Sequence, residues 1–330
     1  MGDPSRVGEA RRYAADLAQR LDFDAIQRGR LAVAVNELGN NLLRHARGGR
    51  LLLAARAMDG GVAIELLSID DGPGMGDLQA CMRDGFSTGG SAGQGLGAVQ
   101  RLADDFDIHT RAGEGTLILA RFFRDRDAGG GPVRHRNGFE VGAICVPAPG
   151  EQVSGDGWDV AVVESRVDLV MADGLGHGPD AAEAAMAALA AFDSERGALP
   201  GNYVERSHAA LRGTRGAAVG ALRLDAAAGR IRFAGAGNII GRVISGVADR
   251  TLLTQSGTAG LQMRSVQEQE LEWPPHAQVI LHSDGVQSRW QLADPGVLQR
   301  DPALVAAYVF WKFSRGRDDA TVVVVRRTDN

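Results

Sequence analysis

Three polar side chains recur at four-residue intervals near the start of the chain: Glu37, Asn41 and His45. Residues four apart lie on one side of a helix, so these side chains form a polar stripe beside an apolar stripe that includes Leu38 and Leu42. Carboxylate and amide oxygens in one row can bind a divalent cation, and a carboxylate can act as a base. Taken alone, such a stripe is more typical of a solvated helix face.

Two glycine-rich segments that follow this helix favour a phosphate-binding site. Asp70 ends an apolar run, and Gly72 and Gly74 after it permit close backbone approach. Further on, alternate glycines lead directly into a predicted helix, whose free N–H groups can hold a phosphate; they are Gly93, Gly95 and Gly97. Each segment alone is a weak signal, since Asp-Gly is equally typical of a turn. The sequence has no Walker lysine, which excludes a P-loop mechanism.

In the second half of the chain, acidic residues lie beside glycine at the ends of predicted strands. They are Asp156, Asp173, Asp284 and the pair Asp318 and Asp319. A single Asp-Gly pair is usually a turn, but four such blocks are hard to explain as turns alone. Carboxylates that converge on one place repel one another unless a cation neutralises them. Hard oxygen donors indicate Mg²⁺ or Mn²⁺ and not zinc.

Hydrophobic periodicity predicts the elements that position the first group of residues. An amphipathic helix starts near Asp24, and two apolar runs separated by Asp59, Gly60 and Gly61 form a hairpin. Predicted strands cover residues 50–57, 62–69, 106–111 and 116–123, and a helix covers residues 98–105. The expected architecture is a layer of helices over one mixed sheet.

Strands dominate the second half of the chain. Predicted strands cover residues 139–146, 158–164, 167–171, 217–224, 230–234, 239–245, 279–282 and 320–326, and predicted helices cover residues 180–194 and 203–211. This order indicates two packed sheets with helices outside.

A segment of mixed charge and glycine that contains Pro132 separates the two halves over residues 122–137. We therefore predict a first domain over residues 1–124, a linker over residues 125–137 and a second domain over residues 138–330. Two domains agree with 330 residues at about 150 residues per domain.

The composition excludes several classes of protein. Hydrophobic residues make up 44% of the chain and charged residues 23%, which is ordinary for a globular protein. A net charge of −5 gives no attraction to nucleic acid or to anionic lipid. The longest apolar run, residues 184–192, is far shorter than the ~18 residues of a membrane-spanning helix, so we expect a cytoplasmic protein. Cys81 and Cys145 have no metal-binding spacing and are expected to be reduced thiols.

The N-terminal motifs together resemble the ATP-binding fold of the GHKL superfamily, a two-layer α/β sandwich, and within it the RsbT type of switch serine kinase. The resemblance rests on Glu37–Ala46, Asp70–Gly74, Gly93–Gly97 and the pair Gly115 and Thr116. It implies that Asn41 ligates Mg²⁺ on the ATP phosphates, that Asp70 accepts a hydrogen bond from the adenine amino group, and that Glu37 is the base. It also implies that Gly72, Gly74 and Thr116 contact the nucleotide. Three further glycines would surround the triphosphate: Gly93, Gly95 and Gly97. The role of His45 stays open between the site and packing.

The C-terminal blocks resemble the SpoIIE-type metal-dependent serine/threonine phosphatases, which form an α/β/β/α sandwich, and most closely the RsbX type. The resemblance implies that Asp173 bridges two metal ions, that the carbonyl of Gly174 binds one, and that Asp284 and Asp318 bind the other. The resemblance also implies that Asp156 supports the site through waters. Asp318 is preferred to Asp319 because the family ligand is the first residue of its motif.

The sequence departs from the phosphatase pattern at two places. As a result, it identifies neither the residue that donates the proton nor the residue that binds the phosphate. Leu175 stands where many relatives have a candidate acid histidine, and His177 is the nearby alternative. The usual phosphate-binding arginine is not identifiable, although Arg134 and Arg136 precede the first strand of this half.

The two resemblances imply a bifunctional regulator that phosphorylates and dephosphorylates STAS-domain proteins of a stressosome-type module, with ATP, Mg²⁺ and Mn²⁺ as cofactors. An alternative keeps the phosphatase but makes the N-terminal half a module that binds ATP and sequesters a partner without transferring phosphate. A purely structural scaffold would require both sites to be degenerate, and the intact acidic and glycine positions argue against it.

Overall fold

The computed structural model describes residues 3–46, 48–58, 61–82, 95–125, 138–194 and 196–328. The chain divides into two compact units, Met1–Arg134 and His135–Asn330. Within the described residues, no helix is both long enough and apolar enough to cross a membrane.

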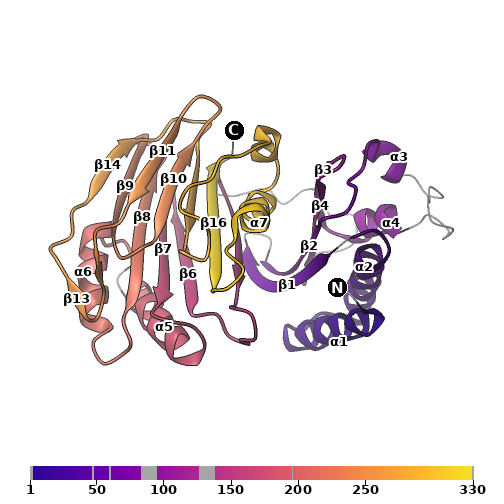
Figure 1. The fold of residues 1–330 in the computed structure, drawn as a ribbon, viewed down its shortest axis with the longest axis horizontal. Helices are drawn as coiled ribbons and strands as arrows, with labels where there is room; N and C mark the ends of the chain where they lie inside the picture. Colours follow the sequence, from indigo (N-terminus) through magenta and orange to yellow (C-terminus); the bar gives the residue numbers. More distant parts are fainter. Residues whose placement is uncertain are drawn as a thin grey trace. The chain divides into compact units, whose positions relative to one another are not determined.

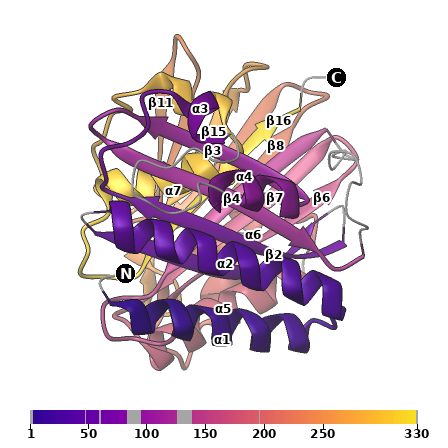
Figure 2. The same ribbon diagram turned by 90° about the vertical axis from the view of Figure 1, so that its right-hand side faces the viewer.

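The N-terminal unit is one antiparallel sheet with helices on one face, as Figure 2 shows for α1, α2 and α4. The strands lie in the order β1-β2-β4-β3. Its elements are α1 (Pro4–Arg20), α2 (Ala25–His45), β1 (Gly49–Met58), β2 (Gly61–Asp70), α3 (Leu78–Met82), α4 (Gly95–Leu102), β3 (Asp105–Arg111) and β4 (Gly115–Phe123).

Local sequence signals fix the start of α2, the helix that carries the polar stripe. Asp24 accepts a hydrogen bond from the backbone of Gln27 at 2.7 Å, and the Gln27 side chain accepts one from the backbone of Asp24 at 2.9 Å. This reciprocal capping box satisfies two N–H groups that would otherwise be unpaired. The buried side of α2, including Leu31, Val35 and Leu38, packs in the core between the helices and the sheet.

A buried ion pair fastens α2 to the connection between α4 and β3. The guanidinium of Arg30 lies 2.7 Å from Asp104 and also donates to the carbonyl of Leu102. Asp104 in turn accepts a hydrogen bond from the backbone N–H of Phe123 at 2.8 Å. Because both charges are nearly excluded from water, this pairing fixes the position of α2 relative to the sheet.

The C-terminal unit is built from two packed sheets (Figure 1). The first has the strand order β11-β10-β15-β16-β5 and the second β14-β9-β8-β7-β6. Its strands are β5 (Phe139–Val146), β6 (Asp156–Val163), β7 (Arg166–Gly174), β8 (Ala217–Asp225), β9 (Arg230–Ala236), β10 (Ile240–Ile244), β11 (Asp249–Leu253), β12 (Gly257–Thr258), β13 (Gln262–Met263), β14 (Gln269–Glu272), β15 (Gln278–His282) and β16 (Ala320–Arg327). Its helices are α5 (Pro179–Ser194), α6 (Pro200–Ala210), the 3₁₀ helix η1 (Pro295–Gln299) and α7 (Pro302–Phe313).

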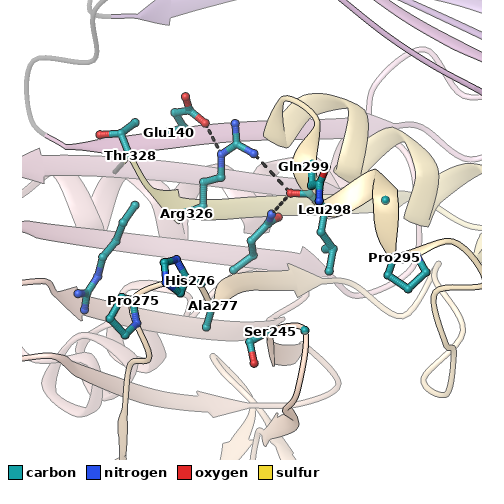
Figure 3. Close-up of a pocket in the computed structure, with 14 residues that line it drawn as sticks. Glu140, Ser245, Pro275, His276, Ala277, Pro295, Leu298, Gln299, Arg326 and Thr328 are labelled. Carbon is teal, nitrogen blue, oxygen red and sulfur yellow. Dashed lines mark hydrogen bonds and ion pairs between the residues drawn. The ribbon is translucent and has the colours of Figure 1, made fainter. Parts of the chain in front are cut away.

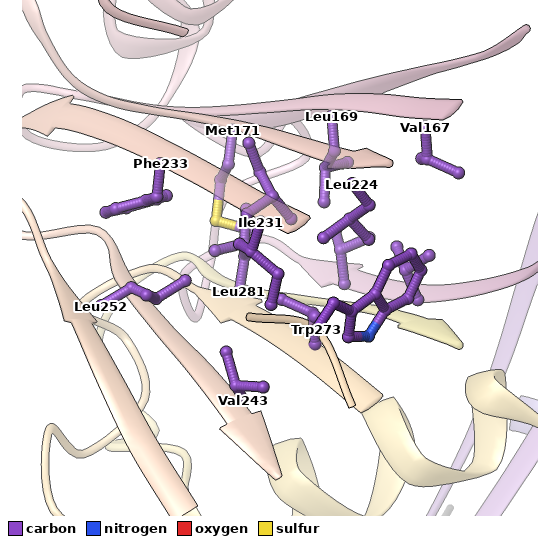
Figure 4. Packing of buried hydrophobic residues seen from close by; sticks show 14 of the residues in the cluster. Val167, Leu169, Met171, Leu224, Ile231, Phe233, Val243, Leu252, Trp273 and Leu281 are labelled. Atoms are coloured by element: carbon purple, nitrogen blue, oxygen red, sulfur yellow. The ribbon is translucent and has the colours of Figure 1, made fainter. Parts of the chain in front are cut away.

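Apolar side chains fill the space between the two sheets. Leu169, Met171 and Phe233 come from one sheet, and Val243 and Leu281 come from the other, as Figure 4 shows. A second cluster packs α5 and α6 against the outer face of the second sheet. Helix α7 packs on β5 and β16 of the first sheet. The order of layers is therefore α/β/β/α, and the predicted fold class is confirmed for both units.

Several elements were not predicted from the sequence, among them α1 and α7. The helix predicted over residues 98–105 is α4, which spans Gly95–Leu102. Helix α7 is apolar on nearly all sides, because Pro302–Phe310 are all buried, and it therefore lacks the periodicity of an amphipathic helix.

The packing of α7 on β5 yields a prediction about stability. A methyl group at Gly142 would lie 2.0 Å from the backbone nitrogen of Ala303, whereas one at Gly246 would meet no atom within 4 Å. We expect Gly142→Ala to lower the thermal midpoint of the C-terminal unit by about 3–10 °C, since overpacking costs about 1–3 kcal/mol. Gly246→Ala is the matched control. Equal midpoints for the two variants, measured by calorimetry on the full chain, would contradict this packing.

Candidate functional sites

A cavity of about 400 Å³ in the N-terminal unit collects most of the residues predicted to bind nucleotide. It lies between the polar stripe of α2, the end of β2, the start of β4 and the start of α4. Predicted site residues that line it are Glu37, Asn41, His45, Asp70, Gly74, Gly95 and Thr116. The cavity therefore brings together residues that are up to 79 positions apart, from Glu37 to Thr116.

Backbone N–H groups hold the Asp70 carboxylate in place. It is the last residue of β2 and pairs with Thr116 of β4. One of its carboxylate oxygens accepts a hydrogen bond from the N–H of Gly72 at 2.7 Å. Burial raises the pKa of Asp70, and hydrogen bonds from Gly72 and Thr116 lower it. The result is a partly buried acceptor with a fixed orientation.

The start of α4 lies close to one carboxylate and one amide of α2, the side chains of Glu37 and Asn41. A methyl group at Gly95 would lie 2.7 Å from Oε2 of Glu37 and 3.8 Å from Oδ1 of Asn41. The first N–H groups of a helix have no partner within the helix, and they favour an anion. A glycine at this position therefore keeps open a space bordered by a helix N-terminus, a carboxylate and an amide.

Not every predicted glycine lines the cavity. A methyl group at Gly72 would meet Oδ1 of Asp70 at 2.6 Å and the carbonyl of His45 at 2.7 Å, so this glycine permits close packing. Gly97 is buried within α4 and is not part of the lining. Gly93 lies outside the described residues.

Other residues that were not assigned to the site from the sequence also line this cavity, among them Arg44 and Cys81. Arg44 lies three positions after Asn41 on the same helix, so helical periodicity could have identified it. The position of Cys81 depends on how the segment around α3 folds back, for which the sequence carries no periodic signal.

In the C-terminal unit, the predicted aspartates come together from two sheets. Asp156 begins β6 and lies directly opposite Asp173 of β7. Asp284 follows the end of β15, and Asp318 precedes the start of β16. Because these four strand ends lie at one edge of the sandwich, the carboxylates act on one another electrostatically.

Burial is the main cause of altered acidity in this cluster. Burial and the negative charges of Asp156, Asp284 and Asp318 raise the pKa of Asp173 to about 9. Burial also raises the pKa of Asp156 to about 7, against a hydrogen bond from Ser283 that lowers it. The cluster therefore favours protons or cations at neutral pH.

Ser283 connects three segments of this cluster, and the sequence analysis did not identify it. Its hydroxyl donates to Oδ2 of Asp156 at 2.6 Å and accepts from the backbone N–H of Thr321 at 3.0 Å. It is fully buried. Its neighbour His282 accepts a hydrogen bond from the indole of Trp290 at 3.2 Å. The serine thus ties the ends of β15, β6 and β16 together.

The donor groups fit hard divalent cations. Among the described residues of this cluster, Oδ1 of Asp156 and Oδ2 of Asp319 are buried without a hydrogen-bond partner. All donors in the cluster are oxygens, which suits Mg²⁺ or Mn²⁺. Among the described residues, however, no group of three or more His, Cys, Asp or Glu side chains already forms a ligand arrangement for one ion. The carboxylates are near one another without a closed ligand set.

Glycines occur in this cluster where backbone segments pack too closely to leave room for a side chain. A methyl group at Gly174 would lie 2.0 Å from the carbonyl of Ala181, and one at Gly285 would lie 1.9 Å from the carbonyl of Asp319. The N–H of Gly174 also donates to the carbonyl of Gly155 at 3.0 Å. These contacts bring the loops that carry Asp173 and Asp284 close to their neighbours.

Two other residues considered for the phosphatase site, His177 and Leu175, lie on the surface. His177 is exposed, and its Nδ1 lies 2.7 Å from Oε1 of Glu151. Leu175 is also exposed. Arg134 and Arg136 lie outside the described residues. Asn238, which the sequence analysis missed, donates a hydrogen bond to Oδ2 of Asp284 at 2.6 Å.

A larger cavity of about 760 Å³ lies at the opposite end of β5, β15 and β16, and it contains none of the predicted residues (Figure 3). Its charged and polar groups mostly bind one another. Arg326 binds Glu140 and donates to the carbonyl of Arg300 at 2.7 Å, and Gln278 donates to the carbonyl of Leu298. Arg327 lies over the ring of Trp273.

The raised pKa values of the cluster predict how stability depends on pH in the absence of metal. A carboxyl group whose pKa is raised by folding keeps its proton in the folded chain at pH values at which the unfolded chain has lost it. Its contribution to stability therefore falls as the pH rises from the unfolded pKa, about 4, to the folded pKa, and changes no further above it. We expect the thermal midpoint of the C-terminal unit, measured in chelator, to fall between pH ~4 and pH ~9, the range set by Asp156 and Asp173.

Asp173→Asn should flatten this dependence, because the amide does not ionise. Added Mn²⁺ should raise the midpoint of the wild type at pH ~8 more than that of the variant. A midpoint that rises with pH in chelator would contradict the assigned direction of the pKa shifts.

Comparison with known proteins agrees with the two sites. Residues 2–122 match the model of the histidine kinase-like ATPase domain, and residues 164–328 match the model of stage II sporulation protein E (SpoIIE). The serine/threonine-protein kinase RsbT of Bacillus subtilis is 37% identical over 111 residues, which is 34% of this chain and 84% of RsbT. An anti-sigma F factor of Caldanaerobacter subterraneus is 30% identical over 33% of this chain and 79% of its own length.

Two solved structures resemble part of the chain. One from work on the bacterial stressosome, described as a modular system adapted to control secondary messenger signalling, is 31% identical. It covers 57% of this chain and 99% of its own, with a TM-score of 0.53. RsbX in complex with magnesium is 18% identical over 58% of this chain and 96% of its own, with a TM-score of 0.50, and shows a shared fold. The chain therefore belongs to the histidine kinase-like ATPase family through its N-terminal part and to the SpoIIE family through its C-terminal part.

Proposed function

We propose that this protein is a bifunctional signalling regulator, which phosphorylates serine or threonine on a partner with its N-terminal unit and removes that phosphate with its C-terminal unit. The observation that carries the proposal is the pairing, in one chain, of a cavity at a helix N-terminus with a buried carboxylate cluster. The similarity to a protein named as a serine/threonine kinase and to the SpoIIE family supports it.

We propose a STAS-domain protein of a stressosome-type module as the partner. The 31% identity to a chain from the bacterial stressosome supports this choice, as does the similarity to RsbT. We also place the reaction in the cytoplasm, because ATP is the proposed phosphate donor.

In the N-terminal cavity, Asp70 would accept a hydrogen bond from the adenine amino group, and Gly74 and Thr116 would contact the nucleotide. The N–H groups at the start of α4 would bind phosphate oxygens beside Gly95. Asn41 would hold Mg²⁺, which neutralises the phosphate charge. Glu37, which borders the same space, would accept the proton of the attacking hydroxyl.

In the C-terminal cluster, Asp173, Asp284, Asp318 and the carbonyl of Gly174 would hold two divalent cations, and Asp156 would support them through waters. Such cations acidify a water and stabilise charge on the phosphoryl group. The protein's own contribution is to hold the carboxylates in place. Ser283 fixes Asp156, and Asn238 fixes Asp284.

The second candidate function keeps the phosphatase and makes the N-terminal unit a module that binds ATP and sequesters a partner. The 30% identity to an anti-sigma F factor favours this candidate. Transfer of labelled γ-phosphate to a purified STAS-domain protein distinguishes the two candidates, because sequestration leaves the partner unlabelled.

Glu37 provides the sharpest test of kinase activity. Glu37→Gln should lower the rate of phosphate transfer by at least about 100-fold, because a general base contributes about 10²–10⁴-fold. ATP affinity, measured by calorimetry, should change little, whereas Asn41→Ala should weaken it. Glu9→Gln, an exposed change on α1, is the control. A wild type that binds no ATP would contradict the N-terminal assignment.

Asp284 tests the phosphatase. Asp284→Asn removes one charged cation ligand and should lower Mn²⁺-dependent hydrolysis of a phosphoserine peptide by at least about 100-fold. ATP binding by the same protein should remain normal. Asp193→Asn, an exposed change near the end of α5, is the matched control. Normal hydrolysis by Asp284→Asn at low Mn²⁺ would show that the cation ligands are assigned wrongly.

A further inference from the structure

A short segment between α7 and the carboxylate cluster carries two arginines, Arg315 and Arg317. Backbone hydrogen bonds fasten this segment to the turn that contains Asp284. The N–H of Arg315 donates to the carbonyl of Gly285 at 2.7 Å, and the N–H of Gln287 donates to the carbonyl of Phe313 at 2.9 Å. The segment is therefore part of the rim of the cluster, and its backbone position is fixed.

The conformation of this segment keeps both arginine side chains on the surface. Gly316 between them has a φ of +68°, which side chains other than glycine rarely adopt, and open space surrounds its Cα. Arg315 and Arg317 are both exposed, and no ion pair within the described part of the chain engages either guanidinium. By contrast, Arg215 near Gly176 is paired with Asp180 at 2.7 Å.

Both guanidinium groups act electrostatically on the cluster. Burial and the charge of Asp318 raise the pKa of Asp284, whereas Arg315 and Arg317 lower it. The charge of Arg315 also contributes to the lowered pKa of His282, after burial. The two groups are thus free for another partner and lie within electrostatic range of the proposed cation ligands.

The charge balance of the site requires such groups. Asp156, Asp173, Asp284, Asp318 and Asp319, all ionised, carry five negative charges, and two divalent cations leave one negative charge. A phosphoserine group at neutral pH carries a charge of about −1.5 to −2 and would meet a site of like sign. Two arginines reverse the sign of the site, and guanidinium groups bind phosphate oxygens in a planar, two-pronged manner.

We propose that Arg315 and Arg317 form the subsite that binds the phosphate group of the phosphorylated substrate. This inference rests on the phosphatase activity proposed above. The Arg-Gly-Arg segment replaces the phosphate-binding arginine that the sequence analysis could not identify.

The direct test is binding of inorganic phosphate to the full-length, Mn²⁺-loaded protein, measured by isothermal titration calorimetry. Arg315→Gln and Arg317→Gln should each weaken phosphate binding by about tenfold, and the double variant by more. Lys at either position should restore part of the loss. Arg250→Gln changes an exposed arginine on β11 at the far end of the same sheet and should have no effect. Unchanged phosphate affinity in the double variant, or no phosphate binding by the wild type, would overturn the subsite.

Titration of Mn²⁺ into the same variants separates substrate binding from support of the loop. Loss of a positive charge near the cations should leave Mn²⁺ affinity unchanged or increase it. Mn²⁺ affinity that falls in parallel with phosphate affinity would show that the arginines only hold the Asp318 loop, and this result would overturn the proposal.

Hydrolysis of a phosphoserine peptide then separates the subsite from the proposed function. The Gln variants should raise KM by about tenfold with a smaller change in kcat, because the arginines bind the phosphate before and during the reaction. A wild type that binds phosphate through these arginines but hydrolyses no phosphopeptide would contradict the phosphatase function and leave the subsite standing. Normal hydrolysis with an unchanged KM in the double variant would overturn the subsite alone.

Discussion

Mutual repulsion among buried carboxylates is the constraint on which the C-terminal unit depends. Asp156, Asp173 and Asp284 come from two different sheets, and the charges of Asp156 and Asp284 add to burial in raising the pKa of Asp173. The fold must therefore hold them together against this repulsion. It does so with the buried hydroxyl of Ser283, with close contacts at glycines such as Gly174, and with an apolar core between the sheets. The strain of this arrangement is what makes the cluster receptive to cations.

In the N-terminal site, the main structural requirement is open space for a ligand and not the control of charge repulsion. Its cavity exists because a glycine begins α4 beside Glu37 and Asn41, and because Asp70 is held by backbone N–H groups away from them. The two units thus use different physical means for opposite chemistry. One places a helix N-terminus beside its cavity, an arrangement that favours an anion, and the other brings carboxylate oxygens together, an arrangement that favours cations.

The sequence predicted those parts of the fold and site that depend on local spacing. Glu37 and Asn41 share a helix face because four residues make about one turn, and the order of strands and helices indicated the layers of both units. Helix α7 was missed because it is buried on nearly all sides and has no polar face. Ser283 and Asn238 were missed because their partners, Asp156 and Asp284, are 127 and 46 positions away. Such pairings depend on sheet register, which residue spacing does not encode. The resemblance to the GHKL superfamily also implied nucleotide contacts by Gly72 and Gly97, and neither residue is among those that line the cavity.

The strand order of the first sheet in the C-terminal unit has a consequence for synthesis of the chain. β5 is the first strand of this unit and β16 the last, yet they are hydrogen-bonded neighbours over Phe139–Val146 and Ala320–Arg327. The sheet is incomplete until β16 has left the ribosome and entered between β15 and β5. The residues that complete the carboxylate cluster, Asp318 and Asp319, arrive with that strand. All the strands of the N-terminal unit are synthesised before β5, so we infer that a nascent chain can fold its nucleotide cavity long before its phosphatase site exists.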